Sequence, residues 1–208
     1  MADAPGTEHT RDEAAAARFL AEAQERTRAG DADGARRLLV EAARAGSLPA
    51  AMQLGAWELI GLGGPADMPL AIARLRDAAD RGHASASTLY AQLIAAGAGG
   101  LERNFGEVLA RLVDAAKSGE PRAAMQLAIL IPDAQENAPV RTALMRAAAS
   151  AGEPISRMFL ERSPPSPPSP PLDWADVGAR VSWPHQRALP EAEPRSERPR
   201  IVALRGLF

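Results

Sequence analysis

Cysteine is absent from the 208 residues, and aromatic residues make up only 4% of them. Without cysteine the chain has no disulfides, no thiolate nucleophile and no cysteine-based zinc site. The absence of cysteine does not indicate whether the protein resides in an oxidising or a reducing compartment. No window reaches about 18 apolar residues without a charge, so we predict no membrane span. The 24 basic and 26 acidic residues nearly balance, and no basic stripe stands out. Nucleic acid is therefore not an expected partner, because binding it requires clustered basic charge.

The apolar residues, 46% of the chain, are mostly alanine and leucine. Alanine is the best helix former and its small side chain lets helices pack closely, which favours an all-α fold. Ten of the 18 prolines lie between Pro164 and Pro199, so they interrupt only a tail. The start of the chain is polar and acidic and shows no secretory signal. We expect a disordered start over residues 1–10 and a cytoplasmic location.

A repeated motif organises the chain from residue 31 to about residue 160. The pattern Ala-Ala-x-x-Gly occurs four times, with its glycines 36, 37 and 33 residues apart. A large apolar residue lies three positions before each alanine pair, and an Asp or Asn lies eleven positions before it. In chain order the glycines are Gly46, Gly82, Gly119 and Gly152, the apolar residues Leu39, Leu75, Leu112 and Met145, and the polar residues Asp31, Asp67, Asn104 and Asn137.

Each mark in the repeat has a physical role in a helix. Asp and Asn are preferred helix N-caps, the apolar residue and the alanines fall on one helical face, and glycine closes the helix in the left-handed conformation. The pattern therefore predicts helices over residues 31–45, 67–81, 104–118 and 137–151. Another helix, the first helix of the next pair, is predicted after each glycine, with Pro49, Pro121 or Pro154 near the first turn of three of them. A further amphipathic helix over 11–28 completes the first pair.

Stacked helix pairs bury apolar faces that one pair leaves exposed. Residues 11–162 are thus expected to form about four helix pairs and a closing half-pair, arranged as a right-handed α/α superhelical solenoid. A spaced set of residues carries this pattern: Leu54-Gly55, the loop 61–64, Asp67, Ala71, Ala78-Ala79, Gly82-His83 and Ala86. This set resembles the SEL-one-like repeat (SLR) family, relatives of tetratricopeptide repeats. The resemblance covers residues 31–160 and implies an adaptor in protein complexes.

The tail has a different composition. Residues 163–198 begin with a Ser-Pro-Pro repeat that predicts an extended polyproline II linker. Trp174 and Trp183 are expected to pack on the last helix pair or on a missing neighbour. Residues 199–208 are predicted to form a strand that has no pairing partner in this chain, which is the possible start of a second domain. They resemble the first strand of prolyl-4-hydroxylase-like oxygenases, which use iron(II) and 2-oxoglutarate. None of that family's metal-binding residues has a counterpart here.

A search for catalytic chemistry finds no convergent set. His9, His83 and His185 are scattered, and His83 follows a repeat glycine, where a capping or turn role is expected. The acids are caps or solvated helix positions rather than a converging pair. The glycine clusters 61–64 and 97–100 occupy one repeat position and read as turns, since no strand precedes them. We therefore predict no catalytic, cofactor-binding or metal-binding residues.

The predicted function is a non-enzymatic scaffold that binds a peptide or protein on the concave face of the solenoid. The first helices of the pairs usually line that face, so residues on these helices are the candidates for contact with the partner. For Trp57 and Tyr90 a position in the core is the alternative interpretation. An alternative function is the accessory region of a 2-oxoglutarate oxygenase whose catalytic domain is absent from this chain. The candidates for partner binding are Gln53, Trp57, Tyr90, Gln92 and Gln126.

Overall fold

The computed structural model describes residues 5–132 and 137–162 together with Trp174 and Val177. Within these residues every element is a helix, as the repeat predicts. The helices are α1 (Pro5–Arg28), α2 (Ala32–Arg44), α3 (Leu48–Ile60), α4 (Met68–Asp80), α5 (Ala84–Ala96), the short 3₁₀ helix η1 (Ala98–Gly100), α6 (Phe105–Lys117), α7 (Pro121–Leu130), α8 (Ala138–Ser150) and α9 (Pro154–Arg162).

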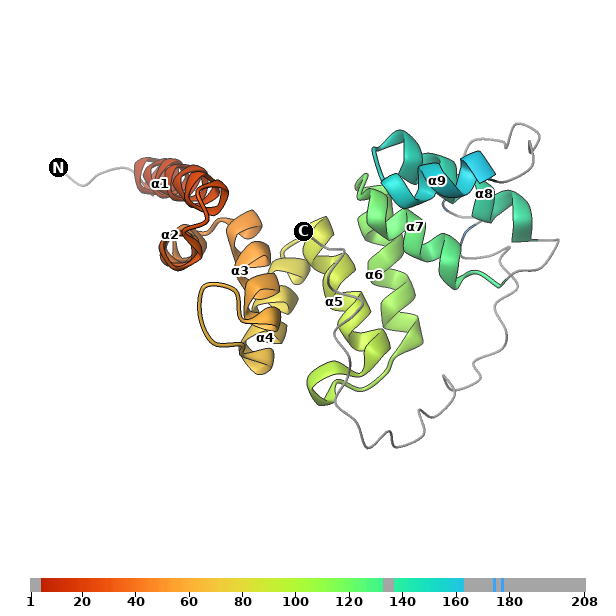
Figure 1. Ribbon diagram of the computed structural model, residues 1–208, viewed down its shortest axis with the longest axis horizontal. Helices are drawn as coiled ribbons and strands as arrows, with labels where there is room; N and C mark the ends of the chain where they lie inside the picture. The colour runs from red at the N-terminus through yellow and green to blue at the C-terminus, as the bar shows by residue number, and fades with distance from the viewer. Residues whose placement is uncertain (1–4, 133–136, 163–173, 175–176, 178–208) are drawn as a thin grey trace.

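The helices form consecutive pairs that stack along the molecule (Figure 1). Helix α1 packs on α2, α3 on α4, α5 on α6 and α7 on α8, while α9 packs on α8 as a closing half-pair. Each pair also contacts the next one through the second helix of one and the first helix of the other. The described residues therefore form an α/α solenoid of four helix pairs and a half-pair. None of the described helices is long and apolar enough to cross a bilayer.

The predicted N-caps begin three of the second helices. The carboxylates of Asp31 and Asp67 accept from the backbone amides of Gly34 and Leu70 at 2.8 and 3.0 Å. The side chain of Asn104 accepts in the same way from the amide of Glu107, at 3.0 Å. These bonds satisfy amides that the first turn of a helix leaves without an intrahelical partner. The boundaries predicted from the repeat therefore agree with the structure at these three helices.

The Ala-Ala-x-x-Gly motif is the C-terminal cap of each second helix. The first example shows the bonding: Gly46 has a positive φ of 93° and its amide donates to the carbonyl of Ala43. The amide of Ser47 then donates to the carbonyl of Ala42. This pair of bonds is the Schellman arrangement, which satisfies the last carbonyls of the helix. The same bonds close α4, α6 and α8 at the other three repeat glycines.

Two helix starts differ from the sequence prediction. Helix α1 begins at Pro5, six residues before the expected start at 11. Asn137 precedes α8 as predicted, but its side chain does not cap that helix. Instead its amide nitrogen donates to the carbonyl of Pro132 at 3.1 Å, and the residue is buried. Its backbone is already α-helical (φ −87°, ψ −14°), whereas the capping residues Asp67 and Asn104 have an extended backbone.

The repeated apolar residues form the core, as the periodicity predicts. Leu39, Leu75, Leu112 and Met145 are all buried, and so is the first alanine of each Ala-Ala pair. One cluster fills the interface of α1, α2 and α3, and a larger one continues from α3 to α8. Because the alanines are small, neighbouring helices approach closely and the larger leucines fill the space between them.

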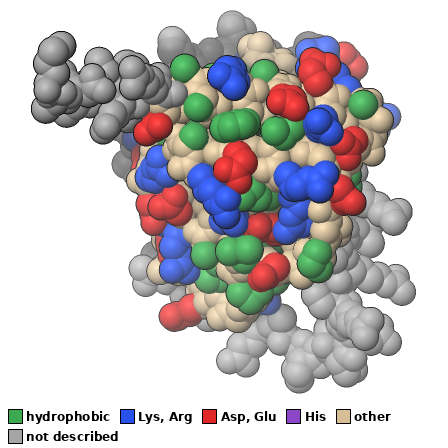
Figure 2. Space-filling view, turned by 90° about the vertical axis from the view of Figure 1, so that its left-hand side faces the viewer, with side chains coloured by type: hydrophobic (Ala, Val, Ile, Leu, Met, Phe, Trp, Pro, Cys, Tyr) green, Lys and Arg blue, Asp and Glu red, His purple; other side chains and the backbone are tan. Residues whose placement is uncertain are grey.

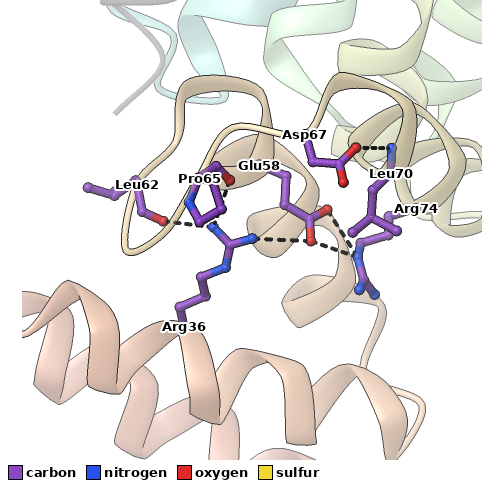
Figure 3. A network of polar contacts seen from close by, with 7 residues as sticks. All are labelled: Arg36, Glu58, Leu62, Pro65, Asp67, Leu70 and Arg74. Carbon is purple, nitrogen blue, oxygen red and sulfur yellow. Dashed lines mark hydrogen bonds and ion pairs between the residues drawn. The ribbon is translucent and has the colours of Figure 1, made fainter.

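A buried carboxylate joins the first two pairs (Figure 3). Glu58 of α3 is 1% exposed and lies between Arg36 of α2 and Arg74 of α4. Arg74 donates to both carboxylate oxygens at 3.0 and 3.1 Å, and an Arg36 guanidinium nitrogen lies 3.7 Å away. Arg36 also donates to the carbonyls of Leu62 and Pro65, which belong to the glycine-rich loop. The network therefore holds that loop against the preceding pair.

Two described residues of the tail pack on the helices. Trp174 packs against the main core cluster, and Val177 is buried. Trp174 thus contacts the body of the solenoid. Trp183, the rest of the predicted linker and the predicted strand at 199–208 lie outside the described residues, so the alternative function based on that strand stays a prediction.

Candidate functional site

A groove of about 300 Å³ crosses three first helices, α3, α5 and the start of α7. Its apolar lining comes mainly from α3, and its polar lining mainly from α5 and the N-terminus of α7. The lining residues are Met52, Gln53, Ala56, Leu59, Ile60, Ser85, Thr88, Leu89, Gln92, Glu120 and Arg122. Its volume lies at the lower end of the range typical of ligand pockets.

Helix starts fix the polar end of the groove. The His83 side chain caps α5 by accepting from the amide of Ala86 at 3.2 Å, and the Glu120 carboxylate caps α7 by accepting from the amide of Arg122 at 3.3 Å. The hydroxyl of Ser85 donates to the second oxygen of Glu120, which ties α5 to α7. Since both caps follow repeat glycines, the repeat itself positions this end of the groove.

The His83 imidazole is partly buried beside this corner, which favours its neutral form. Burial lowers the pKa of His83, and the nearby Glu120 carboxylate only partly opposes the shift. Its Nδ1 atom accepts the Ala86 amide, so the proton of the neutral ring is on Nε2. The capping role predicted for His83 from the sequence is therefore confirmed.

Two of the predicted contact residues lie in the groove. Gln53 and Gln92 are both half-buried, and neither side-chain amide has a hydrogen bond to any residue that the structure describes. Each amide can therefore donate and accept toward the groove. Thr88 differs, because its hydroxyl already donates to the carbonyl of Ala84 at 3.0 Å. The groove thus combines apolar contact area with two free amides.

The structure places the two predicted aromatic residues elsewhere. Trp57 is 1% exposed and packs in the cluster of α1, α2 and α3. Tyr90 is 3% exposed; its hydroxyl accepts from Arg76 Nε at 2.7 Å, and the Arg111 guanidinium lies 4.7 Å from the ring centre. Both belong to the core because they fall on the faces that α3 and α5 turn toward the second helices. Gln126 is half-buried on α7, just outside the groove lining.

Sequence reasoning missed several groove residues, chiefly Ser85, Leu89, Glu120 and Arg122. These residues can be identified from the number of positions that separate each of them from the preceding repeat glycine. Ser85 and Arg122 are each the third residue after a glycine, and Leu89 and Gln53 are each the seventh. Residues at equal distances fall at equivalent places on successive first helices, so the same positions line one surface.

On the face at the α1 end, basic and acidic side chains are interspersed rather than segregated (Figure 2). Among the residues described, no three or more His, Asp or Glu side chains are arranged to hold a metal ion.

Comparison with solved structures finds chains of similar fold, whereas comparison by sequence finds no match. No family model matches the chain, and no curated protein does. A Sel1 repeat protein from Oxalobacter formigenes is similar over 80% of this chain and 73% of that one, with a TM-score of 0.61 and 19% identity. A protective antigen of uropathogenic Escherichia coli with an SLR fold has a TM-score of 0.54 and 24% identity. That match covers 61% of this chain and only 28% of the antigen. The chain therefore has the SLR fold, the α/α solenoid of Sel1 repeat proteins.

Proposed function

We propose that this chain is a non-enzymatic interaction scaffold that binds a peptide or protein segment on the concave face of its solenoid, in the groove formed by α3, α5 and α7. The observation that carries the proposal is the groove itself, which combines an apolar wall, the two free amides of Gln53 and Gln92 and a polar end that includes Glu120 and Arg122. Apolar area supplies affinity, and a few placed polar groups supply orientation.

The distribution of charge supports this choice of face. Helix α5 carries no charged residue, and α3 carries only Glu58, which is buried in its network with Arg36 and Arg74. The second helices α2, α4 and α6 instead carry several charged residues each, such as the paired Asp80 and Arg111. A solvated surface retains charge, while the centre of a binding surface is depleted of it.

A display selection with the full-length chain tests the proposal. Random peptides displayed on phage are selected on the wild-type protein, and the enriched peptides are measured against two variants. Gln92→Arg places a charged side chain in the groove, whereas Ala73→Arg adds the same charge at an exposed position of α4. We expect Gln92→Arg to weaken binding at least about tenfold, because burying an unpaired guanidinium is costly. Ala73→Arg leaves affinity unchanged.

Two results contradict this function. Either no peptide is enriched above background, or the enriched peptides bind wild type and Gln92→Arg equally well. Circular dichroism of both variants is the control for folding. If both spectra match that of the wild type, a loss of binding is attributed to the groove.

A further inference from the structure

One side of α9 is open among the described residues. In each complete pair the first helix packs against the helix that follows it, whereas α9 packs on α8 of the pair before it. Helix α3 shows which side faces a second helix, because Gly55, nine residues after the repeat glycine, lies against Leu75 of α4. The equivalent residue of α9 is Glu161, nine residues after Gly152, and it is exposed. No described residue therefore covers this side of α9.

The tail contains an Asp at the distance that a second helix requires. Asp67 lies 21 residues after Gly46, and Asp173 lies 21 residues after Gly152. The other two repeat units have intervals of 22 and 18 residues between the glycine and the Asn that begins the next second helix. Asp is a preferred N-cap residue, so Asp173 is suited to begin a helix at this point of a fifth unit.

The two described residues of the tail fit the register that Asp173 sets. Trp174 and Val177 are both α-helical, and they are the first and the fourth residue after it. Trp174 is half-buried against the main core cluster, as is Met68 at the first position of α4. Val177 is 1% exposed, and the fourth positions of α2, α4 and α6 are buried in the same way, in Ala35, Ala71 and Val108. The burial of two separate residues therefore agrees with the pattern of a second helix.

The sequence continues this pattern beyond Val177. Val181 is the eighth residue after Asp173, and the eighth position of the other second helices holds the buried core residues Leu39, Leu75, Leu112 and Met145. Ala179 is the sixth, and the sixth position is exposed in α2, α4 and α6, in Arg37, Ala73 and Ala110. Trp174, Val177 and Val181 therefore share one helical face. Pro184 stands where the repeat has its first alanine, so a helix here ends before that residue.

We propose that residues 173–183 form the second helix of a fifth pair and dock on the open side of α9. The occupant belongs to the same chain because Trp174 already contacts the core and Val177 is already buried. The Pro-rich segment then connects the two helices of one pair, with both of its ends on the solenoid, instead of leading away from it. This inference goes beyond the proposed function and does not depend on the groove.

A disulfide tests the proposed contact, because the chain contains no cysteine that could interfere. A Cβ atom at Gly55 would lie 2.8 Å from Leu75 Cγ, so the two positions are close enough for a disulfide. The equivalent pair is Glu161 and Val181. Glu161→Cys/Val181→Cys should therefore form a disulfide within one chain under mild oxidation, detected by mass spectrometry of its proteolytic fragments.

The matched control moves one thiol to the other side of the proposed helix. Glu161→Cys/Ala179→Cys should form the disulfide at least about fivefold more slowly, since residues two apart point in nearly opposite directions from a helix. Equal rates for the two pairs would overturn the inference. A disulfide that joins two chains but not one would also overturn it, because a second copy would then supply the helix.

Thermal unfolding of the full-length chain provides a second, independent test. Val181→Asp places a charge at a proposed core position and should lower the melting temperature by at least about 3 °C. Ala179→Asp adds the same charge at a proposed solvent position and should change it by less than about 1 °C. If the two variants unfold at the same temperature, the segment has no buried face and the inference is wrong, while the proposed function is unaffected.

Discussion

Gly55, in the middle of α3, decides how closely α3 and α4 approach each other. A Cβ atom added there would lie 2.8 Å from Cγ and 3.1 Å from Cδ2 of Leu75, and 3.4 Å from the carbonyl oxygen of Ala71. Leu75 is fully buried, and the crowded atom is its branch point rather than a mobile end. Behind it lies the backbone of α4. The Gly55→Ala variant therefore forces either a rotamer change in the core or a shift of one helix.

Two opposing terms set the expected size of the effect. Alanine stabilises a helix interior by about 1 kcal/mol relative to glycine. Overpacking a filled core costs about 1–3 kcal/mol, and the short contacts to Leu75 and to the α4 backbone place this site in the upper part of that range. We expect the packing term to dominate, so that Gly55→Ala lowers the free energy of unfolding by about 1–2 kcal/mol.

Urea unfolding followed by circular dichroism measures this difference, with Gly106→Ala as the control. Gly106 is exposed in the first turn of α6, and an added Cβ would meet only Asn104 Oδ1, at 3.4 Å. This variant should be neutral or more stable, by up to about 1 kcal/mol. In a Leu75→Ala background, which itself costs about 2–5 kcal/mol, Gly55→Ala should stop being destabilising because the opposing side chain is gone. Equal stabilisation by both glycine replacements would refute the reasoning.

Three further predictions concern polar groups. Burial raises the pKa of Glu58, so the folded state binds its proton more tightly than the unfolded state does. The free energy of unfolding should therefore fall as pH rises from 4.5 through the folded-state pKa, and Glu58→Gln should remove that component from urea titrations at several pH values. Burial lowers the pKa of His83, so stability should decrease as pH falls below 6.5; His83→Asn, which retains an N-cap residue, should show a smaller decrease in the same titrations. Asp67→Ala should cost about 1 kcal/mol in urea unfolding through loss of the α4 cap, and Asp67→Ser should restore most of it.

The sequence predicts the second helices well, because their signals are local. An N-cap such as Asp67 and a cap glycine such as Gly82 act within one helical turn, and an amphipathic helix has a polar side that orients the apolar one. The periodicity therefore correctly predicts that Leu39, Leu75 and Leu112 are buried.

The first helices are harder to predict for the opposite reason. Helices α3 and α5 are apolar nearly all round, so periodicity alone does not show which side faces a neighbour. Trp57 and Tyr90 consequently lie in the core, while Gln53 and Gln92 on the same helices line the groove. The bond from Ser85 to Glu120 joins residues 35 positions apart and has no local signal. Asn137 likewise takes a role set by the carbonyl of Pro132 rather than by its own helix.

The polar contacts between pairs differ from one junction to the next. Glu58 with Arg36 and Arg74 marks the junction of the first two pairs, and Tyr90 between Arg76 and Arg111 marks the following one. The apolar parts of the repeats are close to interchangeable, since Ala50–Leu54 and 123–127 have the same five letters. During folding, a unit that docked in the wrong order would bury an acid or a guanidinium without its counterpart, at a cost of several kcal/mol. These unlike junctions therefore favour the native neighbour of each pair over packing against another pair.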